Sequence, residues 1–461
     1  MAHCLSYFSA SKYFLMKKHI FISAVMTLAF VSASAQRMTL RDCMEYAVEN
    51  STKIKIRQAE NRNDQINRRE AILSAFTPSV GGDVYAYYNF GRSINPETNT
   101  YFSTTSFTNG YSVSAGMYIF NGFKAIDNLK ITSTAKSMGI NEEQQLKDQI
   151  CLATMEAFYN VVYYSELTDI LNSQIKTAQK SLELVQNQNR LGQKGYADIV
   201  QAEAELADRQ YQAITVQNEL NDAYITLKDI MFWPIQDSLA IDFDVDNANP
   251  IYNHTDDPDD IMEAAKNTLP SMLIAEGAMK NAKLELHSAK WSRLPSLTFN
   301  CGWSSSYYTY TDVPGYHTIP FDEQFKNNSG EYIQLSLSIP IFDRFSRHHD
   351  VMRKKNAYAI AEAQYSQRTR EVEAEVLRAI SDRDGASAAM TQALNRESVQ
   401  EQAFQLNTKR HEQGLISSIE YQTAVDNYLN AKAERLYAVL TLIIKQKVVN
   451  YYKGVSYLEQ E

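Results

Sequence analysis

The pattern of apolar and polar positions changes its period several times along this chain, and it does so in the same order twice. Apolar residues first recur at helical spacing, over about residues 39–76 and again over about residues 257–293. Each of these segments predicts one long helix. Pro78 and Pro295 end these helices, because proline disfavours the helical conformation of the residue before it.

Strict alternation follows each proline and predicts a pair of β-strands. We expect strands over about residues 80–91 and 111–119 in the first half, and over about residues 297–310 and 332–340 in the second. In three of these strands every second side chain is apolar or aromatic: Tyr111, Val113, Ala115, Met117 and Ile119, then Leu297, Phe299, Cys301 and Trp303, then Ile333, Leu335, Leu337 and Ile339. Each of these strands therefore has one apolar face.

Each pair of strands would form a hairpin with a polar loop, residues 92–109 or 311–330. The strands have about the length that a tilted membrane strand needs, and tyrosines concentrate towards the loop ends, where an aromatic girdle would lie. These tyrosines are Tyr85, Tyr87, Tyr88, Tyr307, Tyr308 and Tyr310. A soluble sheet packed on a core is the alternative. The two hairpins of one chain cannot close into a barrel, and the unpaired edge of an open sheet cannot persist in lipid. A membrane location therefore requires several chains to share one barrel.

A helical pattern without proline follows each hairpin, over about residues 124–190 and 346–411. At 1.5 Å per residue, such a helix would be on the order of 100 Å long. A turn that contains glycine, RLGQKGYADI or RHEQGLISSIE, then leads into a second helix over about residues 195–231 or 418–452. Long polar helices of this kind suit antiparallel coiled-coil hairpins that project into water.

The two halves are an internal duplication. Asn50 and Asn267 lie 217 residues apart, as the two helix-ending prolines do, whereas Gly192 and Gly414 lie 222 residues apart. The register changes only between the proline and the end of the strands. The halves therefore share one plan and differ mainly in one loop.

The duplication defines the expected domains. Residues 36–232 form the first repeat and residues 261–454 the second, each with a helix, a β-hairpin and a long helical hairpin. Residues 233–260 form an acidic connector with several prolines, and residues 455–461 form a short tail.

The N-terminal segment, residues 1–35, predicts a secretory signal peptide. Two lysines precede an apolar run, and the sequence ASA before Gln36 is typical of a cleavage site. We interpret the residues before Met16 as a mis-called start. The apolar run is too short for a comfortable transmembrane helix, and no later segment reaches about 18 apolar residues.

Composition and charge narrow the function classes. The net charge of −9 favours solubility and argues against nucleic acid as the main partner. Only 16 glycines and 10 prolines occur among 461 residues, which indicates long regular elements with few turns.

Candidate chemistry is sparse. Cys43, Cys151 and Cys301 are widely spaced and predict isolated packed thiols rather than disulfides or a zinc site. His348 and His349 are adjacent and would point about 100° apart on a helix, so we expect a solvated helix start and no metal. No phosphate-binding loop or nucleophile elbow is found. We therefore expect no enzyme activity and no cofactor.

The order of these elements, repeated after a signal peptide, resembles the TolC-like outer membrane efflux proteins. The resemblance covers nearly the whole mature chain. It rests on the duplicated plan and on the turn sequences RLGQKGYADIVQAEAEL, residues 190–206, and GLISSIEYQTA, residues 414–424. It implies a mixed fold of α-helices and transmembrane β-strands, in which three chains each give four strands to one 12-stranded barrel above a periplasmic tube of coiled-coil helices.

The resemblance also implies partners and a location. The chain would be the exit duct of a tripartite efflux or type I secretion system in the outer membrane of a Gram-negative bacterium, in contact with outer membrane lipid. A periplasmic adaptor (membrane fusion protein) and an inner-membrane transporter of RND or ABC type would complete the system. The connector would lie in an equatorial region of the tube.

Site residues follow from the family only by matching its motifs. The helical turns that meet the adaptor correspond to Arg190, Leu191, Gly192, Asp198, Gly414, Leu415 and Glu420. Glu420 and Thr423 are the candidate periplasmic gate. The family's better-known members place a second acidic ring where this chain has Thr423, and a basic residue where it has Ile416. A gate in this chain would therefore be chemically different.

The dipeptides IF after each hairpin mark an expected junction between barrel and tube, formed by Ile119, Phe120, Ile341 and Phe342. Asn121 and Asp343 can cap the helices that follow. Two other functions stay open. One is a secreted structural or adhesive coiled-coil protein, which would not need hairpins with an apolar face. The other is an exporter specialised for proteins rather than small molecules.

Overall fold

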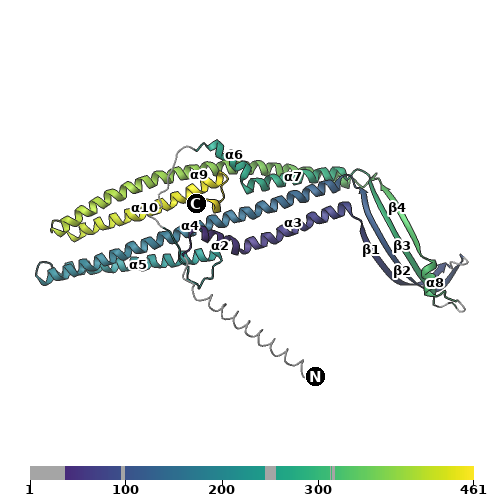
Figure 1. Ribbon diagram of the computed structural model, residues 1–461, viewed down its shortest axis with the longest axis horizontal. Coiled ribbons are helices and arrows are strands. Elements are labelled where there is room, and N and C mark those ends of the chain that lie inside the picture. Colours follow the sequence, from purple (N-terminus) through teal and green to yellow (C-terminus); the bar gives the residue numbers. More distant parts are fainter. Residues whose placement is uncertain (1–36, 95–98, 244–255, 312, 314–316, 461) are drawn as a thin grey trace, which may run out of the picture. The chain divides into compact units, whose positions relative to one another are not determined.

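The computed structural model describes residues 37–94, 99–243, 256–311, 313 and 317–460 (Figure 1). Helices and strands follow one another in the predicted order. The predicted signal peptide, residues 1–35, and residues 244–255 of the predicted connector lie outside the described residues.

Two compact units divide the chain differently from the two sequence repeats. The helical unit comprises Met1–Ser51, Lys147–Asp256 and Arg378–Glu461 in their described parts, and the sheet unit comprises Thr52–Leu146 and Asp257–Leu377. Each unit takes residues from both repeats. The division into repeats therefore remains a prediction about sequence and is not the division into packed bodies.

The sheet unit contains an antiparallel meander of four strands in chain order: β1 (Ser79–Ile94), β2 (Tyr101–Phe120), β3 (Ser296–Tyr310) and β4 (Gly330–Ser338). The first hairpin is longer than predicted, because much of the expected polar loop is paired strand that continues to the pair Ile94 and Tyr101. The prediction of a loop over residues 92–109 rested on the polarity of these residues and is wrong for the paired ones. The threonines in this stretch are β-branched and suit a strand.

Strand register places the predicted apolar positions on one side of the sheet. Val113 pairs with Trp303, and Cys301 pairs with Ile333. We call this side the apolar face; its members include Val80, Val84, Phe90, Phe107, Tyr111, Val113, Phe299, Trp303, Tyr307, Ile333, Leu335 and Leu337. The apolar face predicted for β2, β3 and β4 is therefore confirmed, and β1 adds Val80, Val84 and Phe90 to it.

The opposite, polar face carries serine, threonine, asparagine, glycine and tyrosine. Tyr85 lies across Gly110, and Tyr332 lies across Gly302, where a Cβ atom would collide with the ring. Only Tyr88 and Tyr307 of the six tyrosines predicted for the girdle share the apolar face; the rest alternate to the polar face.

Two predicted helices are each broken once. The first consists of α2 (Leu40–Asn50) and α3 (Thr52–Phe76), and the second of α6 (Pro258–Thr268) and α7 (Pro270–Trp291). Leu269 has ψ 127° because Pro270 follows it, so the prediction of one unbroken helix over about residues 257–293 is wrong at this point. Ser51 breaks the first helix with ψ 123° and is fully buried.

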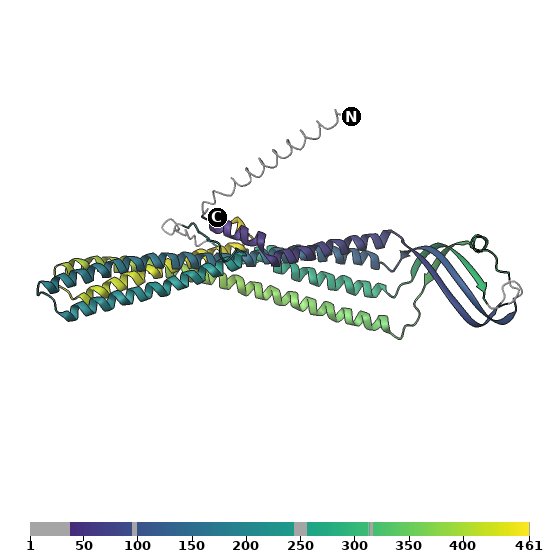
Figure 2. The same cartoon turned by 90° about the horizontal axis from the view of Figure 1, so that it is seen from below.

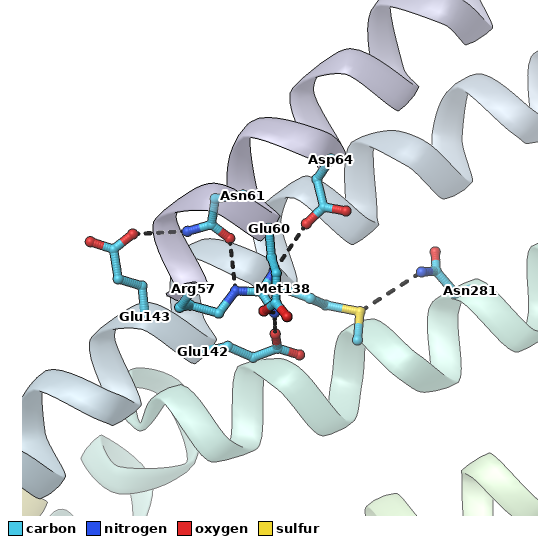
Figure 3. Close-up of polar contacts among 8 residues, drawn as sticks. All are labelled: Arg57, Glu60, Asn61, Asp64, Met138, Glu142, Glu143 and Asn281. Atoms are coloured by element: carbon cyan, nitrogen blue, oxygen red, sulfur yellow. Dashed lines mark hydrogen bonds and ion pairs between the residues drawn. The ribbon is translucent and has the colours of Figure 1, made fainter. Parts of the chain in front are cut away.

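A polar network joins α3 to the first part of α4 (Lys124–Arg190) within the sheet unit (Figure 3). Arg57 pairs with Glu142 at 2.5 Å and with Asp64 at 3.2 Å, and its side chain is only 16% exposed. Asn61 accepts from Arg57 Nε at 3.1 Å and donates to Glu143 at 2.8 Å. Matched polar groups therefore hold these two helices together at this point.

The helical unit contains two helical hairpins, drawn in Figures 1 and 2. The first consists of the end of α4 (Lys124–Arg190) and α5 (Tyr196–Met231), and the second of the end of α9 (Ser346–Glu412) and α10 (Ser418–Tyr452). These bounds agree with the predicted ones within one residue. No helix in the described part of the chain is long and apolar enough to cross a membrane.

The core of the helical unit lies where α2, α4, α5 and α10 meet. Its fully or nearly buried members include Cys43, Met44, Phe158, Val161, Leu227, Met231, Leu436, Leu440 and Tyr457. Tyr457 belongs to a short 3-10 helix, Tyr457–Glu459, and stacks on Tyr451 with ring centres 4.8 Å apart. Burial raises the pKa of the Cys43 and Cys151 thiols to about 12, so both behave as packed apolar groups.

Candidate functional site

Gly192 and Gly414 end the first helix of each hairpin in the same left-handed conformation. Their φ angles are +73° and +70°, a region that glycine adopts without steric cost. The next N–H groups, of Gln193 and Leu415, each donate to a carbonyl oxygen five residues earlier at 2.9 Å. This Schellman arrangement satisfies carbonyl groups that a helix end would otherwise leave without partners.

Asp198 and Glu420 start the returning helix of each hairpin. Glu420 accepts a hydrogen bond from the N–H of Ser417 at 3.0 Å, and its own N–H donates to Ser417 Oγ at 3.2 Å. Asp198 accepts from the N–H of Gly195 at 2.9 Å. Both carboxylates therefore satisfy a donor at a helix N-terminus, and the geometry of the turn alone explains the spacing of glycine and acid in both copies.

The predicted turn residues lie at the surface of the helical unit. Leu191 is 73% exposed and Leu415 68% exposed, and Arg190 and Glu420 are exposed as well. Two further apolar side chains that the motif comparison missed, Tyr196 and Ile419, are 75% and 64% exposed. Each follows its turn glycine within a few residues and starts a helix, so the same local pattern could have identified them.

The predicted gate residues, Glu420 and Thr423, are exposed and lie one turn apart on α10. The Thr423 hydroxyl donates to the carbonyl oxygen of Ile419 at 2.9 Å. Both polar groups are therefore occupied by hydrogen bonds at the start of their own helix.

A charged seam joins α5 to α10 farther along the hairpins. Arg209 forms an ion pair with Asp426 and also lies 3.5 Å from Glu205, with its side chain only 11% exposed. Loss of Asp426 would leave the largely buried Arg209 charge with fewer partners, although Asp426 itself is 38% exposed. No local sequence pattern reveals this contact, since its partners are 217 residues apart.

An open groove of about 370 Å³ follows this seam between the two hairpins. Its lining includes Val185, Ala197, Asp198, Glu205, Tyr421 and Thr423. Burial raises the pKa of Glu205, although Arg209 opposes the shift. Nearby, His411 stacks on Tyr421 with ring centres 4.6 Å apart, and burial together with Lys194 lowers the pKa of His411. The hairpins thus meet through titratable groups.

The strand-to-helix junctions have the caps that the sequence predicts. Asn121 Oδ1 accepts from the N–H of Ala125 at 3.2 Å, and Asp343 Oδ2 accepts from the N–H of Arg347 at 3.1 Å. Gly122 has a φ of +71°, and a Cβ atom there would lie 2.5 Å from a backbone oxygen. The chain therefore turns sharply without a long loop.

The apolar residues of these junctions differ in their contacts. Phe120 packs edge-on against Phe123 with ring centres 5.1 Å apart. Ile119, Ile341 and Phe342 are 54%, 95% and 73% exposed. Phe342 also packs edge-on against Phe345 with ring centres 5.7 Å apart. The predicted packing between barrel and tube therefore stays a prediction. Within the described residues no group of three metal-binding side chains could hold a metal ion.

A protein family described as outer membrane efflux protein matches residues 53–231 and 261–446, well over half of the chain. No curated protein sequence is significantly similar to this chain.

Several solved structures are similar in fold. The outer membrane protein VceC from Vibrio cholerae gives a TM-score of 0.74 at 13% identity, over 90% of this chain and 96% of that chain. The Campylobacter jejuni CmeC outer membrane channel gives 0.73 at 16% identity, over 90% and 85%. The open state of the Neisseria gonorrhoeae MtrE outer membrane channel gives 0.73 at 14% identity, over 92% and 91%. At such identities the likeness establishes the fold alone.

Proposed function

Because the chain belongs to the outer membrane efflux protein family, a family of channel proteins, we propose that three copies form one duct through the outer membrane of a Gram-negative bacterium. This duct would be the exit of a tripartite efflux or type I secretion system. It would receive substrates from a periplasmic adaptor and an inner-membrane transporter. The four-stranded sheet with one apolar, exposed face is the observation that carries this proposal.

The exposed face supports contact with lipid. Val84, Phe90 and Ile333 lie on the apolar face and are 72%, 76% and 80% exposed. Burying a large apolar side chain away from water stabilises a protein by roughly 1.5–3 kcal/mol. An apolar face of this size is therefore unfavourable in water, and we expect lipid to contact it. Polar residues on the opposite face suit a water-filled lumen.

The edges of the sheet support a shared barrel. β1 and β4 each pair with one neighbour in the described chain and leave the other edge unpaired. An open edge cannot persist in lipid, and four strands are too few to enclose a lumen. Pairing β4 of one copy with β1 of the next solves both problems, and three copies would give twelve strands.

The turns of the helical hairpins support a protein partner. Leu191, Tyr196, Leu415 and Ile419 place four largely exposed apolar side chains beside the two glycine turns. Exposed apolar groups gathered at a surface mark interaction sites. We propose that the adaptor binds this surface, together with Arg190, Gly192, Asp198 and Gly414.

The entrance and the junction belong to the same proposal. Three copies of Glu420, with Thr423 one turn on, would line the periplasmic entrance and set its preference for cations. Ile119, Phe120, Ile341 and Phe342 would pack against neighbouring copies where the barrel meets the helical tube. Within the helical hairpins, the charged seam of Arg209 and Asp426 would hold the two hairpins of one copy together.

Purification and conductance test this function. We expect trimers that are extracted only with detergent and that conduct ions in planar bilayers. A water-soluble monomer without conductance would contradict the proposal and favour a secreted structural or adhesive coiled-coil protein. Crosslinking in cells from cysteines placed at Leu191 and Leu415 would capture the adaptor and pump, and the captured pump would distinguish protein export from efflux of small molecules.

A further inference from the structure

The segment between β3 and β4 contains a short helix, α8 (Phe321–Asn327), near the loop end of the sheet (Figure 1). Phe325 of this helix packs against Trp303 of β3 and Tyr111 of β2, with ring centres 5.5 and 5.3 Å apart. Both partners belong to the apolar face. The sequence predicted only a polar loop here, so neither the helix nor its position was expected.

Hydrogen bonds fix α8 to the edge of β3. β4 pairs with β3 only as far as Ser304. Beyond that point Gln324, which is 3% exposed, donates to the carbonyl oxygen of Tyr308 at 2.9 Å and accepts from its N–H at 3.1 Å. Asn328 donates to the carbonyl oxygen of Ser306 at 2.7 Å. The helix therefore covers the edge of β3 beyond Ser304, where it takes the place of a neighbouring strand.

Aromatic rings extend from α8 across the strands. Phe321 is 46% exposed and packs against Tyr307 with ring centres 5.5 Å apart. Tyr307 in turn contacts Phe107, and Phe107 contacts Tyr88. We call this group the aromatic foot; its members are Tyr88, Phe107, Tyr111, Trp303, Tyr307, Phe321 and Phe325.

We propose that the aromatic foot rests in the headgroup layer of the outer leaflet and fixes the depth of the sheet in the membrane. This inference rests on the proposed function, because it requires the apolar face to contact lipid. Tyrosine and tryptophan side chains favour the boundary between membrane and water, because one part of the ring system is apolar and the hydroxyl or N–H group can stay in contact with water. The exposed side chains of Asp322, Glu323 and Lys326 would remain in water.

The order of residues along β4 points to lipid as the occupant. From the junction towards the loop, the apolar face shows Leu337, Leu335 and Ile333, which are 61%, 64% and 80% exposed. Glu331 is the next residue on this face, and it pairs with Trp303 of the aromatic foot. Aliphatic residues followed by aromatic rings and a charge reproduce the depth profile of a bilayer. A neighbouring copy would instead join at the edges β1 and β4.

A single reporter tryptophan tests this position in the full-length protein. Trp233, Trp291 and Trp303 are replaced by phenylalanine, and F321W is introduced. The control is Y308W in the same background, because Tyr308 lies beside α8 but on the polar face. Both variants are reconstituted in phosphatidylcholine vesicles whose lipid is brominated either near the headgroup or near the middle of the acyl chain. Conductance is recorded from the same vesicles after fusion with a planar bilayer.

We expect F321W emission to fall roughly twofold or more with bromine near the headgroup and less with bromine deeper in the chain, whereas Y308W stays unquenched. Conducting channels whose F321W is unquenched would overturn this inference and leave the proposed function standing. A blue-shifted but unquenched F321W would mean that protein covers the foot, with the same consequence. Quenching of Y308W alone would overturn the assignment of the two faces. A soluble protein without conductance would overturn both proposals.

Discussion

Glu420 and Ser417 satisfy each other's backbone at the first turn of α10, where the carboxylate accepts from the N–H of Ser417 at 3.0 Å and the hydroxyl accepts from the N–H of Glu420 at 3.2 Å. The residue proposed to line the entrance is thus also a helix cap. Replacement by alanine would remove the cap and the charge together. Glutamine keeps an acceptor at the same place and removes only the charge.

We expect E420Q to weaken the preference of the channel for cations without lowering its thermal stability. E420A should in addition cost about 0.5–1 kcal/mol, because one helix donor loses its partner. Reversal potentials across a salt gradient and melting curves in detergent would measure the two effects. D198N is the matched control, since Asp198 caps the other hairpin and is not a gate candidate. An unchanged reversal potential in E420Q would place Glu420 away from the entrance.

Gly414 offers a test of the turn itself. A Cβ atom at Gly414 would meet no atom within 4 Å, so a substitution there acts through backbone strain at φ +70° rather than through a collision. We expect G414V to cost about 1–2 kcal/mol and to weaken capture of the adaptor, while G414N should behave nearly as wild type, because asparagine tolerates the left-handed region. Trimer yield and crosslinking efficiency would be compared. Equal loss of trimers in both variants would mean that the turn matters for assembly rather than for partner binding.

The sequence predicted the elements whose signals are local. The observed bounds of α4 agree with the predicted ones, because a stretch of 67 residues with helical periodicity and no proline favours one continuous helix. The break at Leu269 was predictable from Pro270, whereas the break at Ser51 follows from packing that burial alone reveals. The helix α8 escaped because seven residues carry too little periodicity, and its position depends on Gln324 bonding to a distant strand.

The candidate site divides along the same line. Gly192, Gly414, Asp198 and Glu420 were identified by matching family motifs, and the structure shows that each also serves the backbone of its own turn. The pair of Arg209 and Asp426 was not identified, because it depends on how two hairpins pack. The prediction of one aromatic girdle from all six tyrosines is wrong for a different reason. Tyr87 and Tyr88, for example, are adjacent in a strand and must point to opposite faces.

Gly139 tests the network that joins α3 to α4. A Cβ atom there would collide with Asn61 Oδ1 and lie 2.9 Å from Asp64 Oδ2 and 3.0 Å from Arg57 Nη2. Because these groups bond to one another, none can move without losing a partner. We expect G139A to lower the free energy of unfolding by about 1–3 kcal/mol. The control is G385A in α9, where nothing lies within 4 Å and alanine should stabilise the helix by up to about 1 kcal/mol. Equal melting temperatures would show that the network tolerates rearrangement.

Asp256 links the connector to two helices of the helical unit. It forms an ion pair with Arg383, whose side chain is only 2% exposed, and accepts from Lys453 Nζ at 2.7 Å. Burial alone would raise the pKa of Asp256, but the hydrogen bonds from Lys453 and Arg383 outweigh burial and hold the pKa below the ordinary value of 3.8. Arg383 also bonds to Asp384 at 3.0 Å, so loss of Asp256 does not leave it without a partner.

This lowered pKa predicts acid sensitivity of a definite sign. A carboxyl group whose pKa is lower in the folded than in the unfolded chain contributes stability above its unfolded value, and the contribution is lost as the pH falls through the folded value. We expect D256N to cost about 1–2 kcal/mol at neutral pH. Below about pH 4 the difference from wild type should shrink, because wild-type Asp256 then takes up a proton as well. Melting temperatures measured across this range would show the two curves converging. D237N, at an exposed position of the connector, should follow wild type throughout. Curves for D256N and wild type that stay parallel into acid would mean that the ion pair with Arg383 contributes no pH-dependent stability.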